Sequence, residues 1–194
     1  MKHFGFAFLA AAGLAASPAA GQALANAGSD LVKAVKEKDG DKAIQVFSSH
    51  PPGIADAKDG EGNTGLIIAI NRSDDQWTGF MLNKGADPNV AGKGGDTPLI
   101  AAARVGFQQG AEWLIALGAK VNASNRMGET PLILAVQGRN LPIVKMLLSH
   151  GADPDKSDSV AGFSAREYAQ RDPRAREILN AINQQKPKTA SAAK

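Results

Sequence analysis

Short apolar runs recur along the chain and are separated by polar segments rich in glycine. In one run Leu99 and Ala102 lie three residues apart, and a later run repeats this spacing with Leu132 and Ala135. Residues at this spacing share one face of a helix. A second apolar run follows each of them, for example residues 143–148. The pattern therefore predicts pairs of short helices joined by polar loops.

The apolar runs belong to a longer repeat with a nearly constant period. Four phrases begin at glycines that are 33, 33 and 34 residues apart: GNTGLIIAI from Gly62, GDTPLIAAA from Gly95, GETPLILAV from Gly128 and GFSAREYAQ from Gly162. A second phrase keeps the same period, with Gly85, Gly118 and Gly151 again 33 apart. A period of this length indicates a stack of similar units. Such a stack offers an extended binding surface more readily than a catalytic cleft.

The repeated phrases carry the chemistry of helix ends. Thr97 and Thr130 stand where a helix begins, and a threonine hydroxyl at that position caps free backbone N–H groups. Pro98 and Pro131 follow at the first helical position, where the missing N–H costs nothing. Glycines such as Gly118 come after the second helix, where a left-handed residue ends it. Each unit is thus predicted to be a helix, a turn, an antiparallel helix and a protruding finger.

With Thr-Pro-Leu and a following alanine at residues 97–102 and 130–135, and Gly-Ala-Asp after the second helices, the chain resembles ankyrin-repeat proteins. The resemblance extends from about Ser29 to Ile182. It implies an all-α fold, an ankyrin-repeat solenoid of about five helix–turn–helix units with short hairpin-like fingers. The domain is expected at residues 26–184, with units at about 28–58, 59–92, 93–125, 126–158 and 159–182.

The five units are predicted to differ in regularity. The first and fifth carry charged outer faces, as terminal units that cap a stack do. The fifth also has Arg166 where leucine is usual. In the second unit Gly65 replaces the proline, and Gly79 weakens the second helix by about 1 kcal/mol relative to alanine. We therefore expect the second unit to be the least regular of the internal ones.

The N-terminal segment has the layout of a secretory signal peptide. A short basic start precedes an apolar stretch at residues 4–16, and an Ala-Leu-Ala motif ends at Ala25. We expect removal of residues 1–25, with cleavage after Ala19 or Ala20 as the alternative. An uncleaved membrane anchor is disfavoured because the apolar stretch is shorter than the roughly 20 residues that span a bilayer. The alanine-rich form looks bacterial and lacks a twin arginine, which predicts Sec-type export to the periplasm or beyond.

The C-terminal residues 185–194 are basic, lack apolar periodicity and are predicted to be a disordered tail. The formal net charge of the chain is +3, but it falls to −1 when Lys2 and the three tail lysines are left out. A nucleic-acid-binding domain normally has a basic body, so no nucleic-acid partner is expected. The tail is interpreted as solvated, with loose contact to anionic lipid as the alternative.

Residues with catalytic or metal-binding chemistry are scarce. The chain has no cysteine, and His50 and His150 each end a predicted second helix, where they interact favourably with the helix dipole. Residues 56–61 faintly resemble a calcium loop but lack its closing glutamate. Trp77 and Trp113 fall on second helices, either packed in the core or exposed as anchors. We therefore expect no enzyme activity, no cofactor and no metal.

The resemblance also implies where a partner binds. Ankyrin proteins usually contact their partners along the concave face, with finger tips and the ends of the first helices. Carried over to this chain, the finger-tip positions are Glu61, Asn63, Lys93, Asp96, Arg126, Met127 and Glu129. The helix-end positions are Asn71, Arg72, Arg104, Gln137 and Arg171. Three arginines in this groove would suit an acidic partner surface, although solvated polar residues without a partner would give the same pattern.

These observations predict an exported, non-enzymatic scaffold that binds a protein partner through its groove and finger tips. We expect a monomer with no stable membrane insertion once the leader is removed. The alternative is an accessory or protective protein that supports an envelope stress enzyme or neutralises a toxin with the same surface. The sequence does not identify the partner.

Overall fold

The computed structural model describes residues 18–50 and 53–184. The predicted tail and the first part of the predicted leader lie outside these residues. Within them the chain forms paired helices without strands, so the predicted all-α fold is confirmed. The helices are α1 (Pro18–Glu37), α2 (Gly40–Ser49), α3 (Gly65–Asn71), α4 (Asp75–Asn83), α5 (Pro98–Val105), α6 (Gln108–Ala116), α7 (Pro131–Gln137), α8 (Leu141–Ser149), α9 (Ala165–Arg171) and α10 (Arg176–Gln184), with 3-10 turns η1 (Ile54–Asp56), η2 (Lys93–Gly95) and η3 (Pro173–Ala175).

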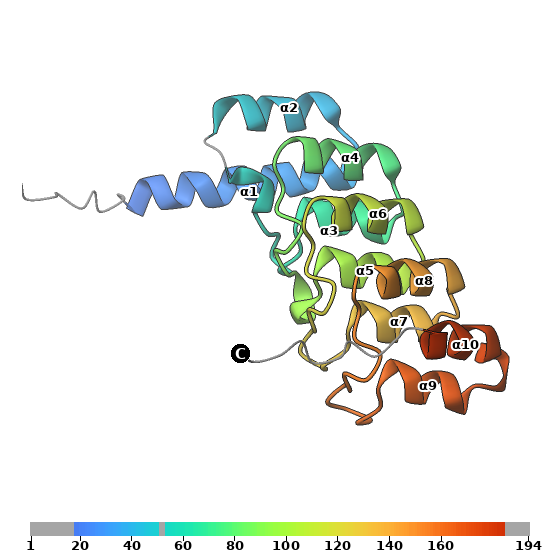
Figure 1. Ribbon diagram of the computed structural model, residues 1–194. Coiled ribbons are helices and arrows are strands. Elements are labelled where there is room, and N and C mark those ends of the chain that lie inside the picture. Colours follow the sequence, from blue (N-terminus) through green and yellow to red (C-terminus); the bar gives the residue numbers. More distant parts are fainter. Residues whose placement is uncertain (1–17, 51–52, 185–194) are drawn as a thin grey trace, which may run out of the picture.

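The helices form two parallel rows. Figure 1 shows α1, α3, α5, α7 and α9 in one row and α2, α4, α6, α8 and α10 in the other. Each first helix packs on the first helix of the next unit and on its own second helix. The fingers project at one edge of the stack, and short turns join the paired helices at the opposite edge, called here the turn edge (Figure 1). This arrangement brings equivalent positions of successive units side by side.

The predicted helix caps are confirmed. The hydroxyls of Thr97 and Thr130 accept hydrogen bonds from the backbone N–H groups of Ile100 and Ile133, each at 3.3 Å. Pro98 and Pro131 occupy the first turn of α5 and α7. The glycines after α4, α6 and α8 have left-handed φ angles of 84°, 87° and 83° at Gly85, Gly118 and Gly151. The sequence motif thus sets both ends of each helix pair.

The second unit is not irregular, so that expectation was wrong. Helix α4 has nine residues, like α6 and α8. The Asp74 side chain caps α4 by accepting from the Trp77 N–H at 3.1 Å, which offsets part of the cost of Gly79. Gly65 has a packing role, because a Cβ there would lie 3.1 Å from Val35 Cγ2 and 3.0 Å from Met81 Cε. Glycine therefore lets the first and second units approach closely.

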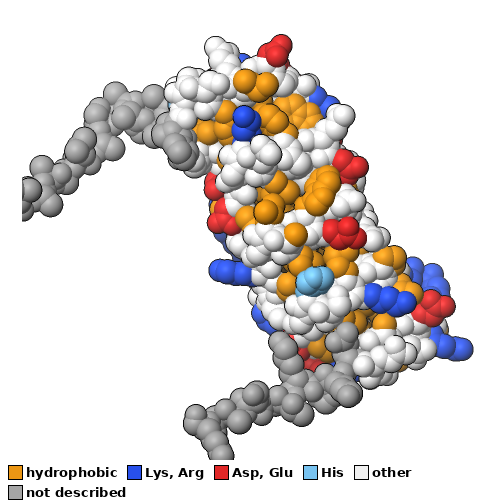
Figure 2. All heavy atoms as spheres, turned by 45° about the horizontal axis from the view of Figure 1, so that its top comes forward, with side chains coloured by type: hydrophobic (Ala, Val, Ile, Leu, Met, Phe, Trp, Pro, Cys, Tyr) orange, Lys and Arg blue, Asp and Glu red, His pale blue; other side chains and the backbone are white. Residues whose placement is uncertain are grey.

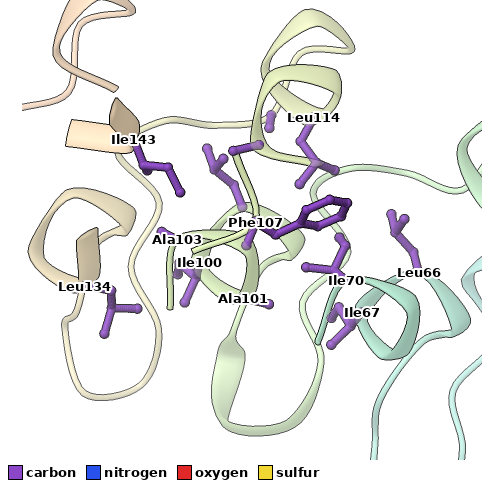
Figure 3. Close-up of a cluster of buried hydrophobic side chains, with 14 of the residues drawn as sticks. Leu66, Ile67, Ile70, Ile100, Ala101, Ala103, Phe107, Leu114, Leu134 and Ile143 are labelled. Carbon is purple, nitrogen blue, oxygen red and sulfur yellow. The ribbon is translucent and has the colours of Figure 1, made fainter. Parts of the chain in front are cut away.

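The core is continuous from the first unit to the fifth. Figure 3 shows its centre, where Phe107 at the start of α6 directs its ring towards Ile70 of the neighbouring unit. A Cβ on Gly110 would lie only 2.4 Å from that ring. Gly110 therefore makes room for a large side chain where other units have a polar helix cap. The phenyl group fills space between units that short helices would otherwise leave open.

Aromatic side chains gather on the outer face of the second-helix row. Trp77 and Phe80 pack edge to face with ring centroids 5.2 Å apart, and Phe80 packs on Phe47 at 5.8 Å. Trp77 and Trp113 are both half-buried. Hydrophobic side chains follow this face in Figure 2. For Trp77 these contacts favour partial core packing over an exposed anchor.

The two ends of the stack are closed differently. Helix α1 begins at Pro18, inside the segment predicted to be removed, but the first side chain described as buried is Ala27. At the other end Arg166 donates from Nε to Asp155 Oδ1 at 2.6 Å and from Nη1 to Asn183 Oδ1 at 2.7 Å. This arginine replaces a core leucine with a polar lid, as suits a last unit. Within the described ranges, no helix has the length and apolarity needed to cross a membrane.

Thr78 on α4 is a polar residue at an apolar position. It is fully buried, as are its equivalents Ala43, Ala111 and Val144 in the other units. Within residues 18–50 and 53–184, its hydroxyl is the buried side-chain polar atom that lacks a hydrogen-bond partner. A buried hydroxyl without a partner carries an unrecovered desolvation cost.

We expect Thr78→Val to raise the free energy of unfolding by about 1 kcal/mol, because valine has nearly the same shape and loses no hydrogen bond. The measurement is a pair of urea melts. Val144 shows that valine is accommodated at this position of the repeat. A lower stability for the variant would mean that a water molecule or the backbone satisfies the hydroxyl in solution.

Candidate binding surface

Each finger is numbered here by the unit whose first helix it precedes, so the second to fifth fingers lead into α3, α5, α7 and α9. One polar side chain at the start of the turn holds three of these four fingers in place. Asn125 Oδ1 accepts from the backbone N–H groups of Met127 and Glu129, both at 3.0 Å. Asp59 and Asp158 occupy the equivalent positions and cap their turns in the same way. At the remaining equivalent position, Gly92, a Cβ would lie 2.7 Å from Ile67 Cδ1. These anchors were missed from the sequence, although their spacing of 66 and 33 residues keeps the register of the repeat and could have revealed them.

A second series of hydrogen bonds joins each finger to the next. Asn89 Oδ1 accepts from the Lys120 N–H and Asn122 Oδ1 accepts from the Asp153 N–H, both at 2.8 Å. The amide groups of the same two asparagines donate to the carbonyls of Gly118 and Gly151. Asparagine serves here because it offers a donor and an acceptor at once. The fingers therefore form a connected edge, which limits independent movement of each loop.

Asp96, Arg104 and Glu129, three of the expected contact residues, meet at the base of the third and fourth fingers. Arg104 forms an ion pair with Asp96, and its Nη2 lies 3.5 Å from Glu129 Oε2. Asn125, which was not expected there, donates its amide to Asp96 at 2.9 Å and to Glu129 at 2.8 Å. We call Asp96, Arg104, Asn125 and Glu129 the finger-base cluster.

The finger-base cluster has a definite charge state. Burial alone would raise the pKa of the Asp96 carboxyl, but hydrogen bonds from Arg104 and Asn125 outweigh it and hold that pKa below its usual value. The pKa of Arg104 is raised, chiefly by its hydrogen bond to Asp96. Arg104 and Asp96 are therefore both ionised at neutral pH and form an ion pair. Arg104 thus stabilises the boundary between two units, whatever else it contacts.

The other two expected arginines also have partners within the chain. Arg72 donates from Nη1 to the Lys36 carbonyl at 2.9 Å, at the end of α1. It therefore lies at the turn edge and not beside Arg104. Arg171 stacks on the Phe163 ring with its guanidinium carbon 3.8 Å from the centroid. The row of three arginines expected on one face is thus divided, because one of them reaches away from the fingers.

The remaining expected residues form one small group and a set of separate exposed positions. Lys93 forms the group with Asn63 and Glu61, since its N–H donates to Asn63 Oδ1 at 3.2 Å and its Nζ lies 3.6 Å from Glu61 Oε2. The others are all exposed: Asn71, Arg126, Met127 and Gln137. The second and third fingers therefore present a mixed-charge surface, which is not strongly basic.

The tips of the fourth and fifth fingers are apolar, and one of them was missed from the sequence. Met127 is 47% exposed and Val160 is 76% exposed. The two tips are adjacent, because the Ser159 N–H donates to the Met127 carbonyl at 2.8 Å. Val160 stands at the position equivalent to Met127, so the register could have predicted it. Neighbouring exposed apolar side chains that form one patch often mark contact sites.

Catalytic geometry does not emerge from the described residues. His50 and His150 each place Nδ1 against a backbone carbonyl of their own helix, at 3.0 and 2.9 Å. Across residues 18–50 and 53–184, no three histidine or carboxylate side chains are placed to hold a metal ion. The candidate surface consists of loops on a helical frame.

Comparison with known proteins agrees with this geometry. A family model for ankyrin repeats in three copies matches residues 22–125 and 80–158, and a search of curated proteins finds no match. The fifth unit lies beyond the matched residues, but α9 packs on α7 and α10 packs on α8 as in the earlier units. The matched residues cover more than half of the chain. The chain belongs to the ankyrin-repeat family, a class of scaffolds for protein–protein interaction.

Proposed function

We propose that this protein is an exported ankyrin scaffold that binds one protein partner through its concave groove and finger tips. The observation that carries the proposal is the adjacent pair of exposed apolar tips, Met127 and Val160, on fingers joined by a backbone hydrogen bond. Exposed apolar side chains bury area that water otherwise covers when a partner binds them. The mixed charges around them supply orientation.

The fingers are suited to recognition because they are organised before a partner arrives. The anchors at Asp59, Asn125 and Asp158 fix each turn, and the hydrogen bonds of Asn89 and Asn122 fix the fingers to one another. A surface that is already ordered avoids part of the entropic cost of association. The mechanism is therefore recognition by a rigid surface, without a chemical step or cofactor.

The proposed contact surface contains the expected groove residues and one addition. Arg126, Met127 and Val160 form its apolar and basic end, and Glu61, Asn63 and Lys93 its polar end. Asp96, Arg104 and Glu129 contribute chiefly by holding the fingers, because they bind one another. On the side of the proposed contact surface formed by the first helices, the contributing residues are Asn71, Gln137 and Arg171. Arg72 lies at the margin of this surface.

The test compares capture of a partner by the native protein and by surface variants. We expect Met127→Asp with Val160→Asp to reduce the retained partner by a factor of about ten or more, as for residues at the centre of an interface. The bait is the mature protein, the source is an envelope extract, and the retained proteins are quantified by mass spectrometry.

The matched control is Ile44→Asp, because Ile44 is 49% exposed but lies on α2, outside the expected contact residues. It should leave capture unchanged, and thermal melts should show that all variants fold. Equal capture by the native protein and the finger-tip variant would place the interface elsewhere. Equal losses in both variants would indicate non-specific apolar adhesion.

Export is the second part of the proposal. Ala25 and Asn26 are exposed, and Ala27 and Gly28 are the first residues of α1 described as buried, where a Cβ on Gly28 would lie 2.6 Å from Ala57 Cβ. Cleavage after Ala25 would therefore leave these contacts intact. The intact mass of protein from a periplasmic fraction should correspond to a chain that begins at Asn26. Full-length chain in the membrane pellet would contradict both the cleavage site and the location.

A further inference from the structure

A basic hollow lies at the turn edge of the last two units, opposite the fingers. It has a volume of about 390 Å³ and is lined by Arg139, Leu141, Pro173, Arg174, Arg176, Glu177 and Ile178. Arg139 belongs to the turn between α7 and α8, and the other arginines belong to η3 and the start of α10. Figure 2 shows basic side chains gathered at this end of the stack, with an acidic one among them.

One of the three arginines has a structural task. Arg139 Nε lies 2.6 Å from Asp172 Oδ2, and this ion pair joins the fourth unit to the fifth. Lys38 and Asp74 make the same bridge between the first and second units, at 2.6 Å. The pKa of Asp172 is lowered to about 2, first by the hydrogen bond from Arg139. The bridge therefore persists at neutral pH and fixes one guanidinium at the rim of the hollow.

The other two arginines are not needed for that bridge. The Arg174 side chain is 73% exposed, and its Nε is 3.5 Å from Asp172, a distant contact. Arg176 makes no side-chain hydrogen bond or ion pair within the described part of the chain. No basic pair stands beside the equivalent Lys38–Asp74 bridge, so stacking of units does not account for Arg174 and Arg176. Their donors are available to a ligand.

The lining of the hollow limits what it can bind. Planar guanidinium groups pair with carboxylate or phosphate oxygens through two parallel hydrogen bonds. Leu141 and Ile178 add an apolar floor that suits a hydrophobic side chain. The carboxylates of Asp172 and Glu177 would repel a dense anion such as a phosphate chain or nucleic acid. A peptide segment whose carboxylates are separated by apolar side chains meets these features better than a dense anion does.

We propose that this hollow is a second binding site, which takes an acidic segment of a protein, with a carboxylate on Arg174 and Arg176 and a neighbouring apolar side chain on Leu141. It is separate from the groove and does not depend on partner binding there.

The test uses a fluorescent acetyl-Glu-Leu-Asp-Leu-Glu-amide peptide and the mature chain. Fluorescence anisotropy should show saturable binding that weakens at least about tenfold in Arg174→Gln with Arg176→Gln, because both charge-assisted hydrogen bonds are lost. Lys33→Gln with Lys42→Gln is the matched control, since it removes the same charge from exposed positions in the first unit. It should change the affinity less than about twofold, as for distant screened charges.

A second measurement places the peptide. The Nε–Hε signals of Arg174 and Arg176 should shift in NMR spectra as the acidic peptide is added. A control peptide in which Gln replaces both Glu residues and Asn replaces Asp should not shift these signals. Equal weakening in the two double variants would overturn the proposal in favour of general charge attraction. Displacement of the peptide by inorganic phosphate at the same concentration would overturn it in favour of a phosphate site. Absence of saturable binding at millimolar peptide would also overturn it.

Discussion

Leu132→Ala is expected to lower the free energy of unfolding by about 2–5 kcal/mol, the range for a buried leucine that leaves a cavity. Leu132 is 1% exposed in α7 and repeats Leu66 and Leu99 in register, which are buried to the same extent. Helix α7 packs on α5, α8 and α9, so a cavity there weakens three contacts at once. Urea melts of the native protein and the variant measure the difference.

The matched control is Leu117→Ala, which removes the same atoms from a side chain that is 55% exposed. It should change stability by less than about 0.5 kcal/mol, as for most surface substitutions. A change that small for Leu132→Ala would mean that the register of the repeats is wrong. Similar losses in both variants would point to an effect of leucine on the unfolded chain.

Asn125→Ala is expected to destabilise the protein by about 2–3 kcal/mol, because it leaves several part-buried polar groups without this partner. Asn125 is 8% exposed and accepts from the N–H groups of Met127 and Glu129 while donating to Asp96 and Glu129. Loss of this anchor should also release the fourth finger. Hydrogen exchange of the Met127 and Glu129 amides should become faster, and urea melts should give the free-energy change.

Asn125→Asp tests the accepting oxygen and the donating NH2 group of this side chain separately, because it keeps the first and replaces the second. An aspartate keeps the oxygen that accepts from the N–H groups of the finger, as Asp59 and Asp158 do in their turns. At those two positions the second carboxylate oxygen accepts from a donor, Lys36 for Asp59 and Tyr168 for Asp158. At position 125 it would instead face the Asp96 and Glu129 carboxylates. Like charges raise the pKa of the new carboxyl in the folded state, so the penalty is present at neutral pH and fades as the group is protonated.

The difference in unfolding free energy between Asn125→Asp and the native protein should therefore shrink as the pH falls from 7 to about 4. Asn125→Ala carries no new charge, and its difference should change much less over that interval. A pH-independent difference for Asn125→Asp would mean that Arg104 neutralises the added carboxylate and that the cluster tolerates three acids.

The sequence alone determined the architecture of this protein, because its signals are local. Capping hydroxyls at Thr97 and Thr130, proline after them and left-handed glycines each depend on a few neighbouring residues. Repetition every 33 residues then aligned these signals, so that the stacked helix pairs and the exposed finger positions could be predicted. The turn anchors and Val160 were accessible in the same way, through register.

Only the tertiary structure decided which side chains meet. Arg104 has partners on two fingers and Arg72 reaches a helix of the preceding unit, and neither contact follows from spacing along one helix. From the sequence, Gly65 was interpreted as a departure from the repeat. The structure shows that Val35 and Met81 pack close to it and leave little room for a larger residue. The basic hollow joins a turn of the fourth unit to the start of α10. A repeat specifies equivalent positions, but long side chains choose among several neighbours, and only their distances in the folded stack settle that choice.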